Sequence, residues 1–221
     1  MNYYNVYRPR AFAEVLGQEH ITSILKRQSI ANQFSHSYCF YGPSGSGKTS
    51  TARILAMALN CLNLKDGEPC GECPSCQAII DGRHWDVQEI DGARFRGIDS
   101  IKELCYRAYF APMGKCKVYI IDECHMLTPE AWAAMLKLIE EPPPSLCIIL
   151  CTTNREAIPD TIVSRCQEYP FDGIKPEAIM QKLKLICQRE NLKHEEITIS
   201  TIAQMSLGNL RAAENRLQQM C

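Results

Sequence analysis

Residues 42–49, Gly-Pro-Ser-Gly-Ser-Gly-Lys-Thr, have the types and the spacing that hold a triphosphate. They fit the pattern G-x-x-x-x-G-K-[ST], whose glycines allow backbone N–H groups to turn toward phosphate oxygens. A helix beginning near Lys48 would add its positive N-terminal end. The Lys48 ammonium would contact the β- and γ-phosphates, and the Thr49 hydroxyl would ligate Mg²⁺. We therefore predict an ATP-binding loop made by Gly42, Gly45, Ser46, Gly47, Lys48, Thr49 and Ser50.

Two carboxylates, Asp122 and Glu123, follow the apolar run Val-Tyr-Ile-Ile at residues 118–121. Ligands of parallel sheets bind at the carboxyl ends of the strands, so we expect this pair beside the phosphate loop. Asp122 would then hold Mg²⁺ through water, and Glu123 would polarise an attacking water as a general base. The alternative is two solvated acids at a strand end, which the phosphate loop makes less favoured.

Four of the thirteen cysteines, Cys61, Cys70, Cys73 and Cys76, have the spacing C-x8-C-x2-C-x2-C. Four thiolates close a tetrahedral structural zinc site and leave no open position for catalysis. An iron–sulfur cluster is the main rival, although the C-x3-C-P element that usually follows is absent; free thiols are the third alternative. We predict a Zn²⁺ site that fastens an insertion at residues 61–76.

Alternating apolar runs and amphipathic segments are expected to position these groups. The predicted strands are residues 38–41, 87–90, 117–121, 146–151 and 166–169, and the predicted helices include 18–32, 98–109, 129–140, 177–189, 198–205 and 210–220. Buried strands that alternate with helices indicate an α/β fold with a mainly parallel sheet covered on both faces. Residues 2–17 are expected to form an irregular arm, because Pro9 prevents regular structure.

The pattern turns purely helical from about residue 176. This change predicts two domains, residues 1–171 for the nucleotide and residues 172–221 for a small helical lid. The formal net charge of −1 argues against a chain that binds DNA phosphates by itself, so nucleic-acid contacts would be local or shared among subunits. No apolar run approaches the ~20 residues of a membrane span and the N-terminus is no signal peptide, so we expect no membrane contact and a cytoplasmic location.

These motifs together resemble the gamma/tau subunits of the bacterial DNA polymerase III clamp loader, which are AAA+ ATPases. The matching stretches are Tyr-Arg-Pro-Arg-Ala-Phe at 7–12, Gly-Gln-Glu-His at 17–20, the phosphate loop, the four cysteines, residues 122–127, residues 138–143, Ser-Arg-Cys at 164–166 and Gly-Asn-Leu-Arg at 208–211. The resemblance covers essentially the whole chain. It implies a five-stranded parallel sheet of order 5-1-4-3-2.

The resemblance also implies roles for individual residues. Asn154 matches the sensor that reads the γ-phosphate or orients water, and Arg165 matches an arginine finger that acts on the ATP of a neighbouring subunit. Arg211 matches a second sensor on the helical lid, and Tyr7, Arg8, Pro9 and Val15 match the stretch that borders the nucleotide base. Each has a simpler alternative: a turn asparagine, a surface ion pair, a solvated helix arginine and an aromatic arm packed on the core.

The function implied is ATP binding and Mg²⁺-dependent hydrolysis that drives loading of the sliding clamp on primed DNA, together with other clamp-loader subunits. The alternatives are a non-hydrolysing stator subunit of the same loader and another AAA+ DNA-processing ATPase such as a Holliday-junction helicase. The chain differs from that family at residues 93–97, Ala-Arg-Phe-Arg-Gly. It also ends at Cys221, before the collar domain of that family. An excised piece and a short paralogue are the two explanations for that ending.

Overall fold

The computed structural model describes residues 2–94, 98–192 and 196–220. Its helices and strands, in chain order, are α1 (Tyr3–Val6), η1 (Phe12–Glu14), α2 (Glu19–Ala31), β1 (Ser37–Tyr41), α3 (Lys48–Asn60), α4 (Pro74–Ile80), β2 (Val87–Asp91), α5 (Ile98–Ala108), β3 (Lys117–Asp122), η2 (Cys124–Met126), α6 (Pro129–Glu140), β4 (Leu146–Thr152), η3 (Arg155–Ala157), α7 (Asp160–Val163), β5 (Gln167–Pro170), α8 (Pro176–Arg189), α9 (Glu196–Met205) and α10 (Leu210–Gln219).

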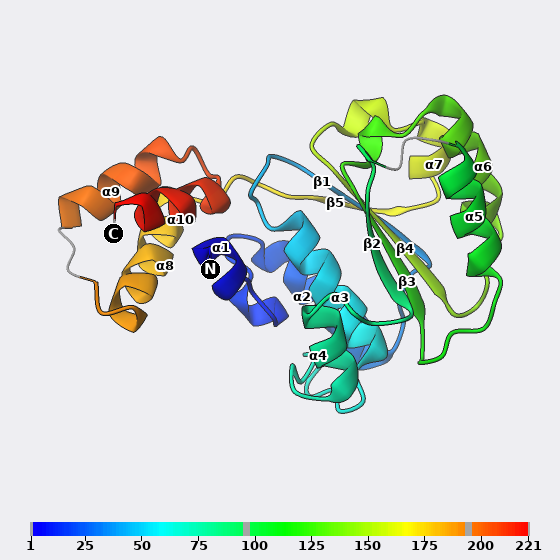
Figure 1. The fold of residues 1–221 in the computed structure, drawn as a ribbon, viewed down its shortest axis with the longest axis horizontal. Helices are drawn as coiled ribbons and strands as arrows, with labels where there is room; N and C mark the ends of the chain where they lie inside the picture. Colours follow the sequence, from blue (N-terminus) through cyan, green and yellow to red (C-terminus); the bar gives the residue numbers. More distant parts are fainter. Residues whose placement is uncertain (1, 95–97, 193–195, 221) are drawn as a thin grey trace.

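The five strands form one parallel sheet with the order β2-β3-β4-β1-β5 (Figure 1). This confirms the predicted order 5-1-4-3-2, read from the opposite edge. β1, β3 and β4 end together, because Tyr41 pairs with Thr152 and Ile121 pairs with Leu150. Loops that follow these strands therefore emerge at one edge, where the phosphate loop and the acidic pair were expected to meet.

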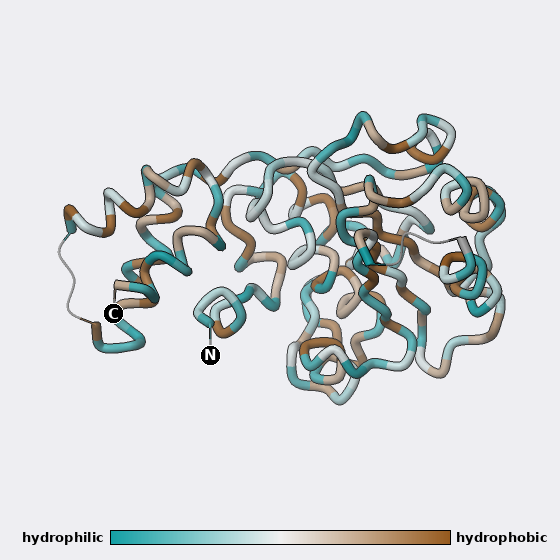
Figure 2. The backbone as a smooth tube through the Cα atoms, turned by 45° about the horizontal axis from the view of Figure 1, so that its top comes forward, coloured by the Kyte–Doolittle hydropathy of each residue, from teal (hydrophilic) through white to brown (hydrophobic). Residues whose placement is uncertain are grey.

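Helices cover both faces of the sheet because alternate strand residues point to opposite sides. Tyr38, Phe40 and Ile149 pack with α2, α3 and α4 in one core, whereas Cys39, Ile148 and Leu150 pack with α5, α6 and α7 in another. Figure 2 shows hydrophobic segments running through the central strands and recurring along the helices. β4 is buried along its whole length, which explains why residues 146–151 are apolar at every position rather than at alternate ones.

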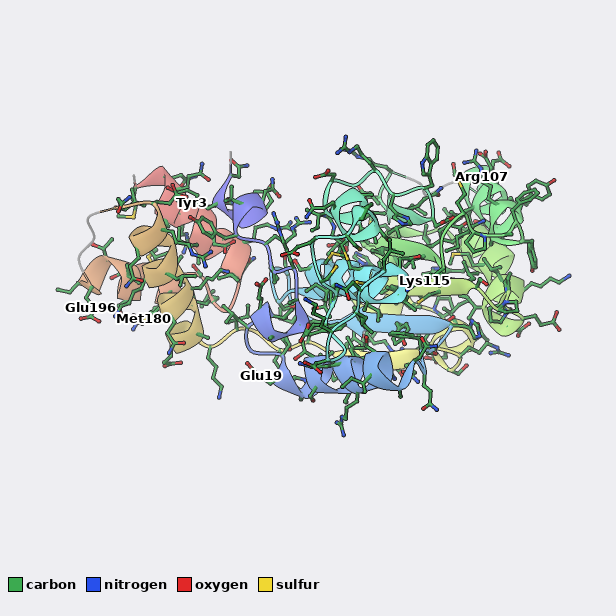
Figure 3. The ribbon with its side chains drawn as sticks, turned by 90° about the horizontal axis from the view of Figure 1, so that it is seen from below. Tyr3, Glu19, Arg107, Lys115, Met180 and Glu196 are labelled. Atoms are coloured by element: carbon green, nitrogen blue, oxygen red, sulfur yellow. The ribbon has the colours of Figure 1, made fainter. Side chains whose placement is uncertain are left out.

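Helices α8, α9 and α10 lie at the end of the molecule opposite α5 and α6 (Figure 1) and have a core of their own. Tyr7 and Tyr3, from the opposite end of the chain, pack in that core. Figure 3 shows Tyr3 beside the C-terminal helices. α10 begins where the Asn209 side chain accepts a hydrogen bond from the backbone N–H of Ala212 at 3.0 Å.

Some predicted boundaries need correction. The arm at residues 2–17 is not irregular throughout, since α1 and η1 form within it on either side of Pro9. The insertion at residues 61–76 ends within α4, which begins at Pro74 and continues to Ile80. Within the departure at residues 93–97, Arg94 pairs with Asp91 at 3.5 Å, while residues 95–97 lie outside the described part of the chain.

In the described ranges, no helix has both the length and the apolar character needed to cross a membrane.

Candidate nucleotide site and cysteine cluster

The phosphate loop connects β1 to α3, and at two of its glycines a larger residue would displace neighbouring atoms. Gly42 and Gly45 have φ angles of 144° and 74°, in the region that favours glycine. A Cβ atom on Gly42 would lie 2.1 Å from the carbonyl oxygen of Phe171, and one on Gly45 would lie 1.9 Å from Oδ1 of Asn209. The loop is therefore held tightly between the end of the sheet and the N-terminus of α10.

Lys48, the first residue of α3, is buried inside the loop. Its Nζ atom donates hydrogen bonds of 2.8 Å to the carbonyl oxygens of Gly42 and Pro43. Burial lowers the pKa of the Lys48 ammonium, and the carboxylates of Glu123 and Asp122 oppose that shift. A buried ammonium beside a turn of backbone N–H groups is suited to pair with an anion.

Asp122 and the phosphate loop are joined by a hydrogen bond from Oγ1 of Thr49 to Oδ2 of Asp122, 2.9 Å long. Burial raises the pKa of Asp122, while this bond and the backbone N–H of Glu123 counteract the rise. A hydroxyl and a carboxylate at the edge of a phosphate loop are oxygen donors of the kind that Mg²⁺ takes. The residues present therefore fit a magnesium ion.

Glu123 lies just beyond the strand in a left-handed conformation, with a φ angle of 47°. Its Oε2 atom accepts a hydrogen bond of 3.3 Å from Oγ1 of Thr153 and lies 3.4 Å from Nδ1 of His125. The same His125 atom lies 3.0 Å from Oγ1 of Thr152. Residues at the ends of β3 and β4 thus hold this carboxylate in place, and its side chain remains partly exposed.

One cavity brings together most of the predicted nucleotide residues. It is lined by Tyr4, Tyr7, Arg8, Pro9, Glu14, Val15, Leu16, residues 44–50, Asp122, Glu123, Ile174, Lys182, Leu210, Arg211 and Glu214. The arm, the phosphate loop, the acidic pair and the C-terminal helices all contribute to it. Of the predicted set within the described ranges, Gly42, Asn154 and Arg165 do not line it.

Asn154 and Arg165 are not among the residues that line this cavity. Asn154 follows β4, where its backbone N–H donates to Oγ1 of Thr152 at 2.9 Å and its side chain is exposed. Arg165 forms an ion pair of 2.7 Å with Glu140 and donates to the carbonyl oxygen of Thr161 at 2.6 Å. The Arg165 guanidinium is thus partly exposed, and it does not line the cavity that contains its own chain's phosphate loop.

Arg211, on the first turn of α10, does line the cavity. Its guanidinium carbon lies 5.4 Å from the centre of the Tyr4 ring, within the range of a cation–π contact. Leu210, its neighbour, donates a backbone hydrogen bond of 3.3 Å to the carbonyl oxygen of Gly45. The C-terminal helices therefore contact the phosphate loop directly.

Several residues of the site were not predicted. Gln18 is fully buried, and its side-chain amide donates to the carbonyl oxygens of Ser46 at 3.3 Å and Asp172 at 2.8 Å, connecting the loop to the segment before α8. Glu214 and Lys182 meet at the cavity from α10 and α8. Burial lowers the pKa of Lys182 and raises that of Glu214 to about 7. A helical spacing of three from Arg211 was the one sequence signal for Glu214.

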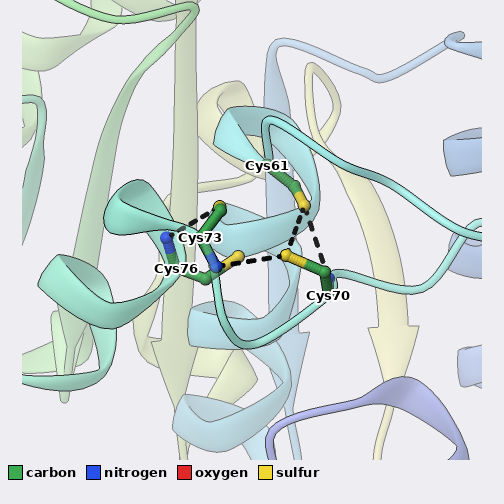
Figure 4. Close-up of side chains that lie close together, drawn as sticks. All are labelled: Cys61, Cys70, Cys73 and Cys76. Carbon is green, nitrogen blue, oxygen red and sulfur yellow. Dashed lines mark hydrogen bonds between the residues drawn. The ribbon is translucent and has the colours of Figure 1, made fainter.

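The four cysteines form a compact cluster between the end of α3 and the start of α4 (Figure 4). Their sulfur atoms all lie within 4.8 Å of one another, and those of Cys61 and Cys70 are 3.5 Å apart. Four sulfurs at about 2.3 Å from a central zinc ion would be separated by about 3.8 Å. The cluster could therefore hold a zinc ion with little rearrangement.

Backbone N–H groups stabilise negative charge on these sulfurs. The N–H groups of Cys70, Cys73 and Cys76 each donate to the preceding cysteine's sulfur at 3.4 Å. N–H donors, first that of Glu72 and then that of Cys73, lower the pKa of Cys70 to about 6. Burial raises the pKa values of Cys61 and Cys76. A bound cation would favour the thiolate form of all four.

Comparison with known proteins identifies relatives over nearly the whole chain. The family described as "DNA polymerase III, delta subunit" matches residues 17–175. The tau subunit of DNA polymerase III from Bacillus subtilis (strain 168) is 45% identical over 217 residues, which are 98% of this chain and 38% of that protein. The gamma/tau subunit of Mycobacterium tuberculosis (strain ATCC 25618 / H37Rv) is 40% identical over 223 residues, which are 100% of this chain and 39% of that protein. The chain therefore spans about two fifths of the length of these relatives.

Among solved structures, the Thermotoga maritima RuvB Holliday junction branch migration motor is similar in fold. It superposes with a TM-score of 0.71 and 17% sequence identity, covering 96% of this chain and 64% of that one. This likeness shows that the two chains share a fold.

Proposed function

Because the chain belongs to the gamma/tau family of bacterial DNA polymerase III clamp-loader subunits, we propose that it is an ATP-binding and ATP-hydrolysing motor. Its cargo would be the sliding clamp, which it would load on primed DNA together with other subunits of the loader. The observation that carries this proposal is the 2.9 Å hydrogen bond between Thr49 and Asp122, which joins the phosphate loop to the acidic pair.

Binding of the triphosphate would rest on the loop itself. Backbone N–H groups of residues 44–50 would contact phosphate oxygens, with Gly42 shaping the turn. Lys48 would exchange the carbonyl oxygens of Gly42 and Pro43 for phosphate oxygens, which is a favourable exchange for a buried ammonium. Tyr7, Arg8, Pro9 and Val15 would border the base, and their place in the lining of the cavity supports this.

Hydrolysis would depend on the ends of β3 and β4. Thr49 and Asp122 would hold Mg²⁺, which supplies positive charge for the phosphates when bound. Glu123 would act as the general base, since Thr153 and His125 hold its carboxylate while it stays partly exposed. Asn154, at the end of the adjacent strand, would sense the γ-phosphate or orient the water.

Arg165 would act on the ATP of a neighbouring subunit. Its place on the surface, paired with Glu140 outside its own chain's cavity, supports a role in trans rather than in cis. An arginine supplied by a partner can raise the rate of phosphoryl transfer by ~10³ or more. The chain alone would therefore hydrolyse ATP slowly.

We propose two domains, residues 1–171 and residues 172–221, with Arg211 sensing the γ-phosphate from the second. The separate core of α8, α9 and α10 supports this division. Contacts of Leu210 with Gly45, and of Gln18 with Asp172, would transmit a change at the loop to the angle between the domains. The cysteine cluster would hold Zn²⁺ as a structural ion, because four sulfur ligands leave no open position.

A non-hydrolysing stator of the same loader is the second candidate. The matching family is described as a delta subunit rather than as gamma/tau, and this description favours the second candidate. The intact loop and acidic pair favour the motor. The two roles make different predictions for nucleotide binding and turnover.

The test is ATP binding by calorimetry with Mg²⁺, followed by turnover with partner subunits, clamp and primed DNA. Lys48→Ala should weaken ATP binding by roughly 10- to 100-fold, since a charge-assisted contact is lost. Lys137→Ala, an exposed lysine on α6, is the matched control. If Lys48→Ala bound ATP as well as the parent, or the parent bound ATP without any stimulated turnover, the motor proposal would be wrong.

A further inference from the structure

The N-terminal helix α1 is fastened to the C-terminal helices rather than to the sheet. The backbone N–H of Tyr3 donates to Oε1 of Gln218 at 3.0 Å, and the Tyr7 hydroxyl donates to Oε1 of Glu190 at 2.6 Å. The guanidinium of Arg189 lies 5.9 Å from the centre of the Tyr7 ring. The ends of the described chain therefore lie side by side, as Figure 1 also shows. The two ends of α1 are thus joined to the ends of α10 and α8.

Tyr4 is the residue of α1 that meets Arg211 at the wall of the nucleotide cavity. Both side chains line that cavity together with the phosphate loop. The Arg211 guanidinium carbon is 5.4 Å from the centre of the Tyr4 ring, whereas the described ion pairs do not include Arg211. Glu214 lies one turn further along α10, where burial raises its pKa and the charges of Lys182, Arg8 and Arg211 oppose that rise.

We infer that Tyr4 is a positioning residue for Arg211. Its ring holds the guanidinium beside the phosphate loop. Through this contact, α1 takes part when the C-terminal helices respond to nucleotide. The contact restricts a long, exposed arginine side chain to the cavity wall, so less conformational entropy is lost when a phosphate binds. This inference rests on the proposed role of Arg211 as a sensor of the γ-phosphate.

The expected effect is a change in the preference for ATP over ADP, because only ATP offers the γ-phosphate to Arg211. A cation–π contact at a partly exposed site corresponds to about a two- to fivefold change in an equilibrium constant. Tyr4→Leu should weaken Mg·ATP binding by about that factor and leave Mg·ADP binding unchanged. Tyr4→Phe keeps the aromatic ring and should behave like the parent chain.

The experiment is a double-mutant cycle measured by calorimetry with Mg·ATP and Mg·ADP as probes. Four proteins are compared: the parent, Tyr4→Leu, Arg211→Gln and the double variant. Tyr4→Leu should have no further effect in the Arg211→Gln background, because the partner of the ring is gone. Glu190→Ala, which removes the acceptor of the Tyr7 hydroxyl and does not line the cavity, is the matched control for loosening α1 without touching the Arg211 contact.

Equal losses of ATP and ADP affinity in Tyr4→Leu that persist in the Arg211→Gln background would overturn the inference, since Tyr4 would then contact the nucleotide itself. An ATP-specific loss of the same size in Glu190→Ala would also overturn it, by showing that α1 acts only as an anchor. Failure of the proposed function is seen separately, as failure of the parent chain to bind Mg·ATP at all.

Discussion

The cysteine cluster and the nucleotide site are built in opposite ways. The four cysteines lie within residues 61–76, and their sulfurs meet through short backbone turns. The nucleotide site draws on residues from Tyr4 to Glu214 and needs the sheet, the arm and the C-terminal helices at once. A metal site of this kind can form locally and stay closed, whereas a site for a triphosphate is assembled from distant elements that can move relative to one another.

The largest expected effect is on ATP turnover, because the nucleotide site, unlike the cysteine cluster, should depend on a neighbouring subunit. Arg165→Ala should lower stimulated ATP turnover by ~10³ or more, because the charge supplied in trans is lost, and should leave ATP affinity nearly intact. Turnover is measured with partner subunits, clamp and primed DNA. Arg27→Ala, an exposed arginine on α2, is the control. Weak ATP binding by Arg165→Ala, measured by calorimetry, would count against the finger role.

Loss of the metal should affect the cysteine cluster and leave the nucleotide site unchanged. Cys73→Ser, or treatment with a chelator, should release the zinc that we propose for the cluster and lower the melting temperature by about 5–10 °C, since metal binding is coupled to folding of the insertion. ATP affinity should change by less than about twofold, because the cluster and the phosphate loop lie at opposite ends of α3. Elemental analysis, thermal unfolding and calorimetry measure the three quantities. A collapse of ATP binding alongside metal loss would show that the regions are not independent.

The smallest expected effect is a pH dependence confined to the assembled site. Burial raises the pKa of Glu214 to about 7, above the ~4.3 of an unfolded chain. Its protonated form therefore stabilises the fold below about pH 4, and that stability is lost as pH rises toward 7. Glu214→Gln cannot titrate, so its free energy of unfolding escapes this loss. The difference between the variant and the parent in free energy of unfolding should therefore shift in favour of the variant by about 1–3 kcal/mol from pH 5 to pH 8. Chemical denaturation at both values measures this difference, with the exposed Glu177→Gln as control. An equal gain in the control would remove Glu214 as the cause.

The same contrast explains what the sequence could predict. The cysteine cluster and the phosphate loop are set by spacings of a few residues, so pattern alone located them. The strand order followed from a family resemblance, and the sheet confirms it. No short spacing of this kind marks Gln18, Tyr4 or Lys182. Their part in the site comes from tertiary contacts over long separations, such as the 154 residues between Gln18 and Asp172.

The arm shows the same limit in local structure. Pro9 prevents a long helix, as predicted. The four residues of α1 nevertheless become helical, because Tyr3 and Tyr7 pack against the C-terminal helices. A helix of this length has little stability of its own, and no local sequence signal for it exists. Tertiary packing therefore decided both the helix and the place of Tyr4 beside Arg211.

The most direct test of the central claim is a crystal structure of the chain with Mg²⁺ and a non-hydrolysable ATP analogue. We predict phosphates against the backbone N–H groups of residues 44–50 and Mg²⁺ held at Thr49 and Asp122. Lys48 should have turned from the carbonyl oxygens of Gly42 and Pro43 to the phosphates. A nucleotide bound elsewhere, or a Lys48 side chain that keeps both carbonyl contacts with the nucleotide in place, would contradict it.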